Sequence, residues 1–160
     1  MKVEVVDEYK TIVYLYNFDE LDYDVKSLEK YFKSIFLKLK DLYEVNVTGF
    51  FNVDVYVDNM YGIVLVIERE KMEYFSYYDN QVNMQINISN NNEFLYEVED
   101  PYLNIEAIKN IYLYKSRYFA QIEEKIDNIR LGQLLEFGKL VYNENTDNIK
   151  RQGKLLKLMI

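Results

Sequence analysis

Carboxylates are the side chains of this sequence with the most evident capacity for chemistry. Asp54 and Asp58 lie four residues apart on a predicted strand, which at 3.3 Å per residue separates them by about 13 Å. That separation is too large for one shared metal ion, so we interpret both as residues of a solvated strand face.

Three other acidic clusters occur, at Glu68 with Glu70, at Glu97 with Glu99 and Asp100, and at Glu123 with Glu124 and Asp127. The first flanks an arginine on a predicted strand. The second ends a strand, where it could present an acidic patch to a basic partner. The third forms either another patch or the cap of the next helix. None has the ligand spacing of an EF-hand loop, so we assign no catalytic, cofactor-binding or metal residue.

The composition disfavours catalysis. The 160 residues include no His and no Cys, which removes the usual proton carrier near neutral pH and the strongest neutral-pH nucleophile. Five scattered glycines form no phosphate-binding loop. We attribute the missing residues to a bias in composition, but the chemical consequence is the same. The sequence predicts a protein that is not an enzyme and uses no cofactor.

Charge and hydropathy bound the partners and the location. The net charge of −8, from 27 acidic and 19 basic residues, disfavours nucleic acid. The longest apolar run, Ile63 to Ile67, is too short to span a membrane, and Met1 to Lys10 has no apolar signal core, so we expect a cytoplasmic protein. The basic residues near the C-terminus are Lys150, Arg151, Lys154 and Lys157. We interpret them as the solvated, dipole-matched end of a last helix.

Residues 1–70 are predicted to form a β-α-β-β unit. Alternation over Val3 and Val5, followed by the β-branched and aromatic run 11–16, indicates either an opening hairpin or a kinked strand. Residues 51–57 with 63–68 indicate a hairpin. Spacing of three and four predicts a helix between these two segments. Its apolar positions are Val25, Leu28, Phe32, Ile35, Phe36, Leu39 and Leu42.

Residues 71–92 are predicted to be a connector rich in Asn and Tyr. Strict alternation from Val82 to Ile88 nevertheless predicts that part of it is a strand that pairs with a sheet. An ordinary edge strand and a site of β-augmentation by a partner peptide both fit this pattern.

Residues 93–160 are predicted to form a second unit, β-α-β-β-α-α. Its elements are a strand over 93–98, a short helix over 103–109 after Pro101, a hairpin over 111–123, a helix over 129–137 ended by Gly138, and a last helix capped by Thr146 and ending near Gly153 or beyond. The fold class is therefore α+β, with two small units of helices packed on mainly antiparallel sheets.

The order of elements resembles that of the MecA-type adaptor family, which hands substrates to a Clp-class unfoldase-protease in low-GC Gram-positive bacteria. The opening carries the resemblance, through Met1-Lys2-Val3-Glu4, Ile12-Val13-Tyr14-Leu15-Tyr16 and Asp19-Glu20-Leu21. It continues through the helix at Leu28 to Leu42 and the hairpin at Phe51 to Glu70.

The C-terminal half is similar to the family in outline. The matching segments are Glu93 to Asp100, Leu113 to Phe119, Leu134 to Gly138, and Ile149 to Leu156 as the last helix. The helix after Pro101 is shorter than in the family, and the alternating Asn-rich segment replaces the charged linker. The resemblance implies that the first unit binds client proteins and the second engages the AAA+ unfoldase, with no bond chemistry and no identified contact residue.

Two other function classes stay open. One is a structural or regulatory protein-binding domain without a Clp partner, for which we consider a homodimer, or another homo-oligomer, joined through the strand at Val82 to Ile88. The other is a carboxylate-dependent enzyme, which requires an acidic cluster that lines a pocket.

Overall fold

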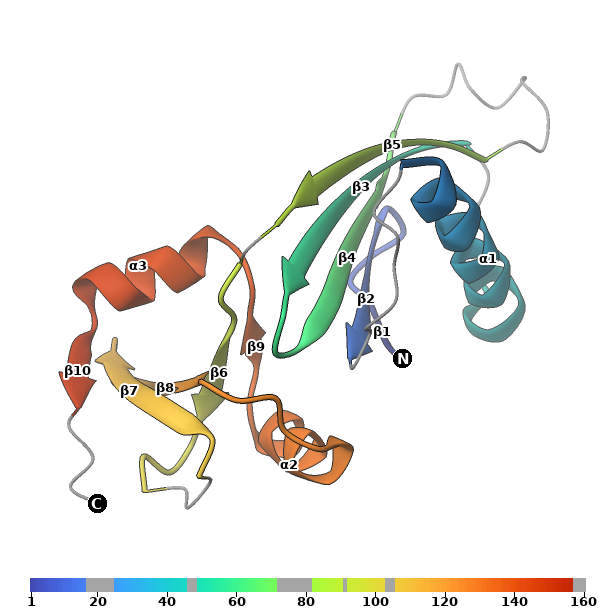
Figure 1. Cartoon of the computed structure of the whole chain (residues 1–160). Coiled ribbons are helices and arrows are strands. Elements are labelled where there is room, and N and C mark those ends of the chain that lie inside the picture. Colours follow the sequence, from blue (N-terminus) through green and yellow to red (C-terminus); the bar gives the residue numbers. More distant parts are fainter. Residues whose placement is uncertain (17–24, 46–48, 72–81, 91, 103–105, 157–160) are drawn as a thin grey trace. The chain divides into compact units, whose positions relative to one another are not determined.

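The protein folds as two compact units, each with its own five-stranded sheet (Figure 1). The computed structural model describes residues 1–16, 25–45, 49–71, 82–90, 92–102 and 106–156. One unit consists of Met1–Val55 and Ile63–Ser89, and the other of Tyr56–Gly62 and Asn90–Ile160. The predicted α+β class with two small, mainly antiparallel units is confirmed.

The first unit packs a helix on a sheet of order β1-β2-β4-β3-β5. Its elements are β1 (Lys2–Val5), β2 (Lys10–Tyr16), α1 (Val25–Tyr43), β3 (Gly49–Asp58), β4 (Gly62–Arg69) and β5 (Val82–Ser89). The predicted opening hairpin is β1 with β2, which pair antiparallel with Val3 opposite Val13. The predicted strand at 82–88 is β5, at one end of the sheet order.

Helix α1 forms because its apolar residues recur on one face. Five of them, Leu28, Phe32, Ile35, Phe36 and Leu39, are at most 2% exposed, and the Phe36 ring lies 5.0 Å from the Phe51 ring of β3. Leu42 was expected on this face but is 71% exposed. At 100° per residue, Leu42 lies at the margin of the buried arc and in the last turn of the helix, where less of the sheet is within reach.

The second unit has a sheet of order β10-β7-β8-β6-β9. Its elements are β6 (Leu95–Val98), β7 (Ile108–Tyr114), β8 (Arg117–Ile122), α2 (Asn128–Phe137), β9 (Leu140–Val141), α3 (Glu144–Gln152) and β10 (Lys154–Leu156). The predicted hairpin is β7 with β8, closed by Lys115 and Ser116 at φ of 47° and 61°. Positive φ at both central residues is the geometry of a two-residue hairpin turn.

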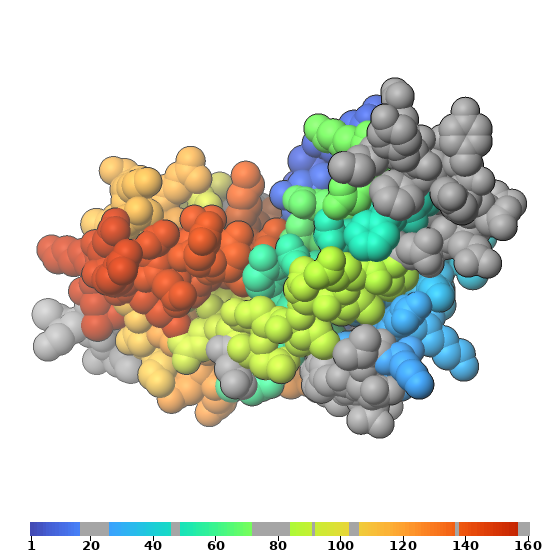
Figure 2. Space-filling model, turned by 90° about the horizontal axis from the view of Figure 1, so that it is seen from above, coloured from blue at the N-terminus to red at the C-terminus, as the bar shows by residue number. Residues whose placement is uncertain are grey.

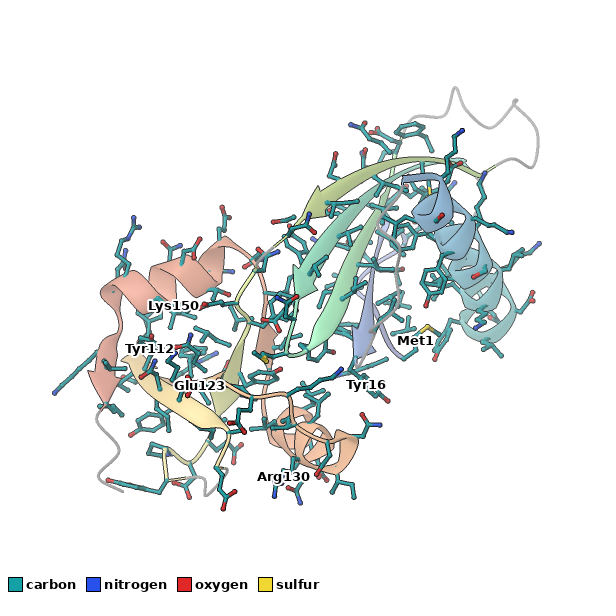
Figure 3. All side chains as sticks on the ribbon, viewed as in Figure 1. Met1, Tyr16, Tyr112, Glu123, Arg130 and Lys150 are labelled. Carbon is teal, nitrogen blue, oxygen red and sulfur yellow. The ribbon has the colours of Figure 1, made fainter. Side chains whose placement is uncertain are left out.

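A small core lies between α3 and the sheet of the second unit. Leu95, Phe119 and Ile149 form a buried cluster, and the half-buried Tyr112 of β7 packs against it (Figure 3). Thr146 is also buried, and its hydroxyl donates a hydrogen bond to the backbone oxygen of Val141 at 3.2 Å. Helix α3 is therefore fixed to the sheet along the side that carries residues 146 and 149.

Three predictions for the second unit are wrong. Residues 108 and 109 of the predicted helix belong to β7, where Ile108 pairs with Ile122 of β8 and Lys109 lies at a shift in the register. Residues 103–105 lie outside the described residues. The cap of α3 is Asn143, whose side chain accepts from the Asn145 N–H, and not Thr146. Residues 154–156 are strand β10, paired with Leu113 to Ile111, and not the end of a helix.

The observed units differ from the predicted ranges 1–70, 71–92 and 93–160 in two places. β5, within the predicted connector, belongs to the sheet of the first unit. Residues 56–62, predicted in the first unit, belong to the second. Two hydrogen bonds account for the second difference, because the Asn92 N–H donates to the backbone oxygen of Val57 at 3.0 Å and the Phe94 N–H donates to the Asp58 carboxylate at 2.7 Å.

Two glycines of the second unit give opposite predictions. A Cβ at Gly138 would lie 1.8 Å from the backbone oxygen of Glu97, whereas a Cβ at Gly132, in α2, meets nothing within 4 Å. We expect Gly138→Ala to lower the free energy of unfolding by about 3 kcal/mol, because the backbone at Gly138 or at Glu97 must move to make room for the methyl group. Gly132→Ala should raise it by up to about 1 kcal/mol through helix propensity. Urea denaturation measures both, and similar effects of the two changes would contradict this account.

Candidate functional site

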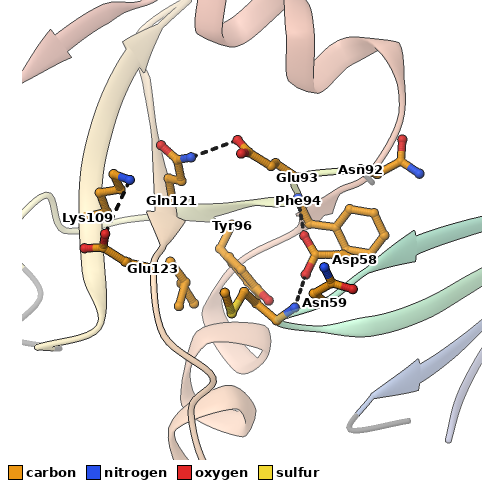
Figure 4. A pocket seen from close by; sticks show the side chains of 11 residues that line it. Asp58, Asn59, Asn92, Glu93, Phe94, Tyr96, Lys109, Gln121 and Glu123 are labelled. Carbon is orange, nitrogen blue, oxygen red and sulfur yellow. Dashed lines mark hydrogen bonds and ion pairs between the residues drawn. The ribbon is translucent and has the colours of Figure 1, made fainter. Parts of the chain in front are cut away.

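The second unit contains a cavity of about 410 Å³ (Figure 4). Three segments line it, and each is held by the fold described above. The turn after β3 contributes residues 58–60, the chain at and before the start of β6 contributes residues 92–94 and 96, and β7 with the end of β8 contributes Lys109 and residues 121–123. This is the concave surface that we consider as a functional site.

Asp58 is the buried carboxylate of this cavity. Asp58 is 6% exposed. Oδ1 accepts from the backbone N–H groups of Met60 and Tyr61, each at 2.7 Å, and Oδ2 accepts from the Phe94 N–H at 2.7 Å. Hydrogen bonds to an ionised acceptor are the strong ones, so Asp58 binds its own turn to the strand that follows 36 residues later.

The interpretation of Asp58 as a solvated residue is therefore wrong. The local part of its role had a signal in the sequence, because Asp followed by Asn-Met-Tyr-Gly between two strands is typical of a turn in which the Asp side chain accepts from the next N–H groups. The bond from Phe94 had no such signal, since it depends on where a distant strand lies. Asp54, by contrast, is half-exposed and accepts from the side chain of Asn87 at 2.9 Å.

Three aromatic rings lie beside Asp58. Tyr61 is 1% exposed, and its ring centroid is 5.6 Å from that of Phe94 and 6.4 Å from that of Tyr96. Burial raises the pKa of the Tyr96 hydroxyl strongly, and the negative charge of Asp58 raises it further. Tyr96 is therefore protonated across the physiological pH range and is not poised to accept a proton.

Paired charges form the rim of the cavity. Glu93 accepts from Lys150 of α3 and from the Gln121 side chain at 2.9 Å, and Lys109 pairs with Glu123 at 3.4 Å. Lys150 lies on α3 (Figure 3), and Figure 4 marks the contacts of Lys109 with Glu123 and of Gln121 with Glu93. Because each named acid has a cationic partner, these pairs leave little net charge on the rim.

The Glu93 pair predicts a pH dependence. The hydrogen bond from Lys150 lowers the pKa of Glu93, so the pair stabilises the fold above the ordinary value near 4.5 and the effect is lost as pH falls through the lowered pKa. Because the Glu93 side chain is 63% exposed, we expect Glu93→Gln to cost no more than about 1 kcal/mol at pH 7 and nothing near pH 2. Urea denaturation at both pH values tests this, with Glu124→Gln as the control. A cost that is equal at both would contradict it.

The acidic clusters that the sequence singled out are largely neutralised or structural. Glu97 pairs with Arg117 at 3.3 Å, and a depression of about 550 Å³ there is lined by Glu99 and Lys139 as well. Asp127 caps α2 by accepting from the Arg130 N–H at 2.8 Å, which favours the cap over a second patch. The cluster on β4 is also paired, with Lys10 to Glu68 at 3.1 Å and Asn52 to Glu70 at 3.0 Å.

Two groups of basic residues stand out among the described residues. Lys150 and Arg151 are in the last turn of α3, as predicted, whereas Lys154 is in β10 and residue 157 lies outside the described residues. The second group, to which the sequence reasoning gave no separate weight, is on α1, which carries five exposed lysines. They are Lys26, Lys30, Lys33, Lys38 and Lys40. Lys33 pairs with Glu29 at 2.9 Å. Ser27 and Lys30 have the Ser-x-x-Lys spacing of some serine nucleophiles, but both are exposed on α1 and line neither the cavity nor the depression described above.

The cavity thus offers hydrogen-bonding groups and ion pairs whose visible role is to hold strands and turns together. Among the described residues, no group of three or more acidic side chains could hold a metal ion. Within the same residues, none of the helices has the length and apolarity needed to cross a membrane. Comparisons of the chain with protein families, with curated proteins and with solved structures find no match.

Proposed function

We propose that this protein is a non-catalytic adaptor that binds client proteins through one unit and a Clp-class AAA+ unfoldase through the other, in the cytoplasm. The observation that carries the proposal is the division of one chain into two compact α+β units with separate sheets. Tethering needs two binding surfaces on one chain, because linkage raises the local concentration of a bound client at the unfoldase. The sequence of the first unit also resembles the MecA-type family in its order of predicted elements, which supports this proposal.

Each unit also presents large apolar side chains to solvent, which supports a role in binding proteins. In the first unit Leu37 is 60% exposed on α1, and in the second Tyr102 is 82% exposed and Ile129 75% exposed. Side chains of this kind supply contact area in protein interfaces. Tyr102 follows the acidic turn at Asp100, whose carboxylate accepts from the Tyr102 N–H at 2.8 Å and so fixes the backbone there.

The second unit departs from the family outline at β10, because the resemblance implied a helix from Ile149 to Leu156 and residues 154–156 are strand. Since that half docks on the unfoldase in the family, the experiment examines the unfoldase and the clients separately. The tagged full chain is used as bait in cytosol of its host, with ATP and an ATPase that cannot hydrolyse it. We expect recovery of a Clp-class ATPase together with client proteins.

Surface variants assign the two activities to the two units. Tyr102→Ser with Ile129→Ser, in the second unit, should reduce recovery of the ATPase. Leu37→Ser, the matched change in the first unit, should instead reduce recovery of client proteins. Recovery of no Clp-class ATPase by the unaltered chain would overturn the adaptor proposal. The assignment would then move to a regulatory protein-binding domain without that partner.

A further inference from the structure

Strand β5 is an edge of the first unit's sheet. The order β1-β2-β4-β3-β5 gives it β3 on one side and, within the described residues, no strand on the other. In the space-filling view from above, the yellow-green side chains of β5 lie at the molecular surface (Figure 2). An edge strand presents backbone N–H and C=O groups that another strand can pair with.

β5 lacks the features that usually protect such an edge. Its eight residues, Val-Asn-Met-Gln-Ile-Asn-Ile-Ser, include no charged residue, no Pro and no Gly. The opposite edge, β1, carries Lys2 and Glu4, and in the second unit the edge strands β9 and β10 have two and three residues. β5 is thus a long and uncharged edge in a chain with a net charge of −8.

The apolar row of β5 is only partly covered. On β3, the core-facing Val53 and Val55 are 0% exposed, whereas Met84, Ile86 and Ile88 of β5 are half-buried. The other face of β5 is polar, with Gln85 exposed and Asn87 donating to Asp54 of β3. A further strand with the same alternation would extend the sheet and place its own apolar residues on the same face as the apolar row of β5, which it would cover.

We propose that the strand that pairs with β5 is β5 of a second copy, in an antiparallel dimer with a two-fold axis. Two acidic chains repel each other least where the contact has no charge, and this strand meets that condition over its whole length. Antiparallel pairing centred on Gln85 or Ile86 places each apolar row on the same face as its partner's. A two-fold interface requires such self-complementarity. The inference rests on the first unit alone and is independent of the adaptor proposal.

Charge substitutions at Gln85 test the dimer in the full chain. In both registers Gln85 faces Gln85 or Asn87 of the second copy, so Gln85→Glu places two like charges near the axis, as does Gln85→Lys. Like charges across strands destabilise pairing, and 1 kcal/mol corresponds to about a fivefold rise in the dimer Kd. Sedimentation equilibrium measures that Kd. Gln133→Glu and Gln133→Lys, on the exposed face of α2, are the matched controls.

We expect the unaltered chain to reach twice its mass of 19.4 kDa at tens of micromolar. Each Gln85 variant alone should dimerise about fivefold more weakly, a mixture of the two variants should recover the dimer, and the controls should not differ from the unaltered chain. A monomer at all concentrations overturns the proposal, as does a dimer that the Gln85 variants leave unchanged. If a monomer instead binds a synthetic peptide of residues 82–89, the edge pairs with foreign strands and not with a second copy.

Discussion

A fragment of residues 90–160 is expected to remain unfolded, although it contains every strand and helix of the second sheet. It lacks residues 56–62, and with them the Tyr61 ring against Phe94 and Tyr96, the Asp58 carboxylate, and the Val57 oxygen that accepts from Asn92. Removing one large buried aromatic side chain alone costs about 3–5 kcal/mol. That loss is comparable with the whole stability of a small domain, about 5 kcal/mol at the low end.

The comparison for this fragment is a single chain in which residues 55–63 are joined to residue 90 by a flexible Gly/Ser linker of about ten residues. We expect the joined chain to give dispersed amide resonances and a cooperative thermal transition, and the fragment to give neither. If residues 90–160 alone melt cooperatively with the same midpoint as the joined chain, residues 56–62 are not part of this unit's core.

Asp58→Ala is expected to lower the free energy of unfolding by about 3 kcal/mol or more. The change leaves three backbone N–H groups, of Met60, Tyr61 and Phe94, without their charged acceptor, and each unsatisfied buried donor costs about 1–3 kcal/mol. Asp58→Asn should have an intermediate effect, because an amide keeps one acceptor oxygen and replaces the other by a donor.

Asp54→Ala is the matched control, on the same strand and four residues earlier. The Asp54 carboxylate accepts from the side chain of Asn87, and Asp54 is half-buried. We therefore expect a cost below about 1 kcal/mol. Urea denaturation followed by circular dichroism measures all three variants. Equal costs for Asp58→Ala and Asp54→Ala would show that the three backbone bonds do not hold the turn in place.

The sequence predicts most of the fold where the signal is local. Helix α1 follows from spacing of three and four, the β7–β8 hairpin from β-branched and aromatic runs around Lys115 and Ser116, and β5 from strict alternation. The errors occur where pairing partners are distant in the chain. Residues 108–109 and 154–156 are strands because β8 and β7 lie beside them, and local pattern holds no information on those neighbours.

The candidate site was predictable to a smaller extent. The bonds from Asp58 to its own turn follow from turn chemistry, and the cap at Asp127 follows from its place before a helix. The cavity itself was not predictable, because it needs the turn after β3, the start of β6 and the β7–β8 hairpin in one place. Pairing of Glu93 with Lys150, 57 residues apart, depends on the same tertiary arrangement.

During synthesis, the turn after β3 is made before the residues that cover it in the folded unit. Asp58 and its neighbours leave the ribosome 36 residues before Phe94, which at 5–20 residues per second is an interval of about 2–7 s. During that interval the Tyr61 ring has neither Phe94 nor Tyr96 to cover it. A chaperone that recognises apolar segments on nascent chains therefore has access to this turn until translation reaches β6.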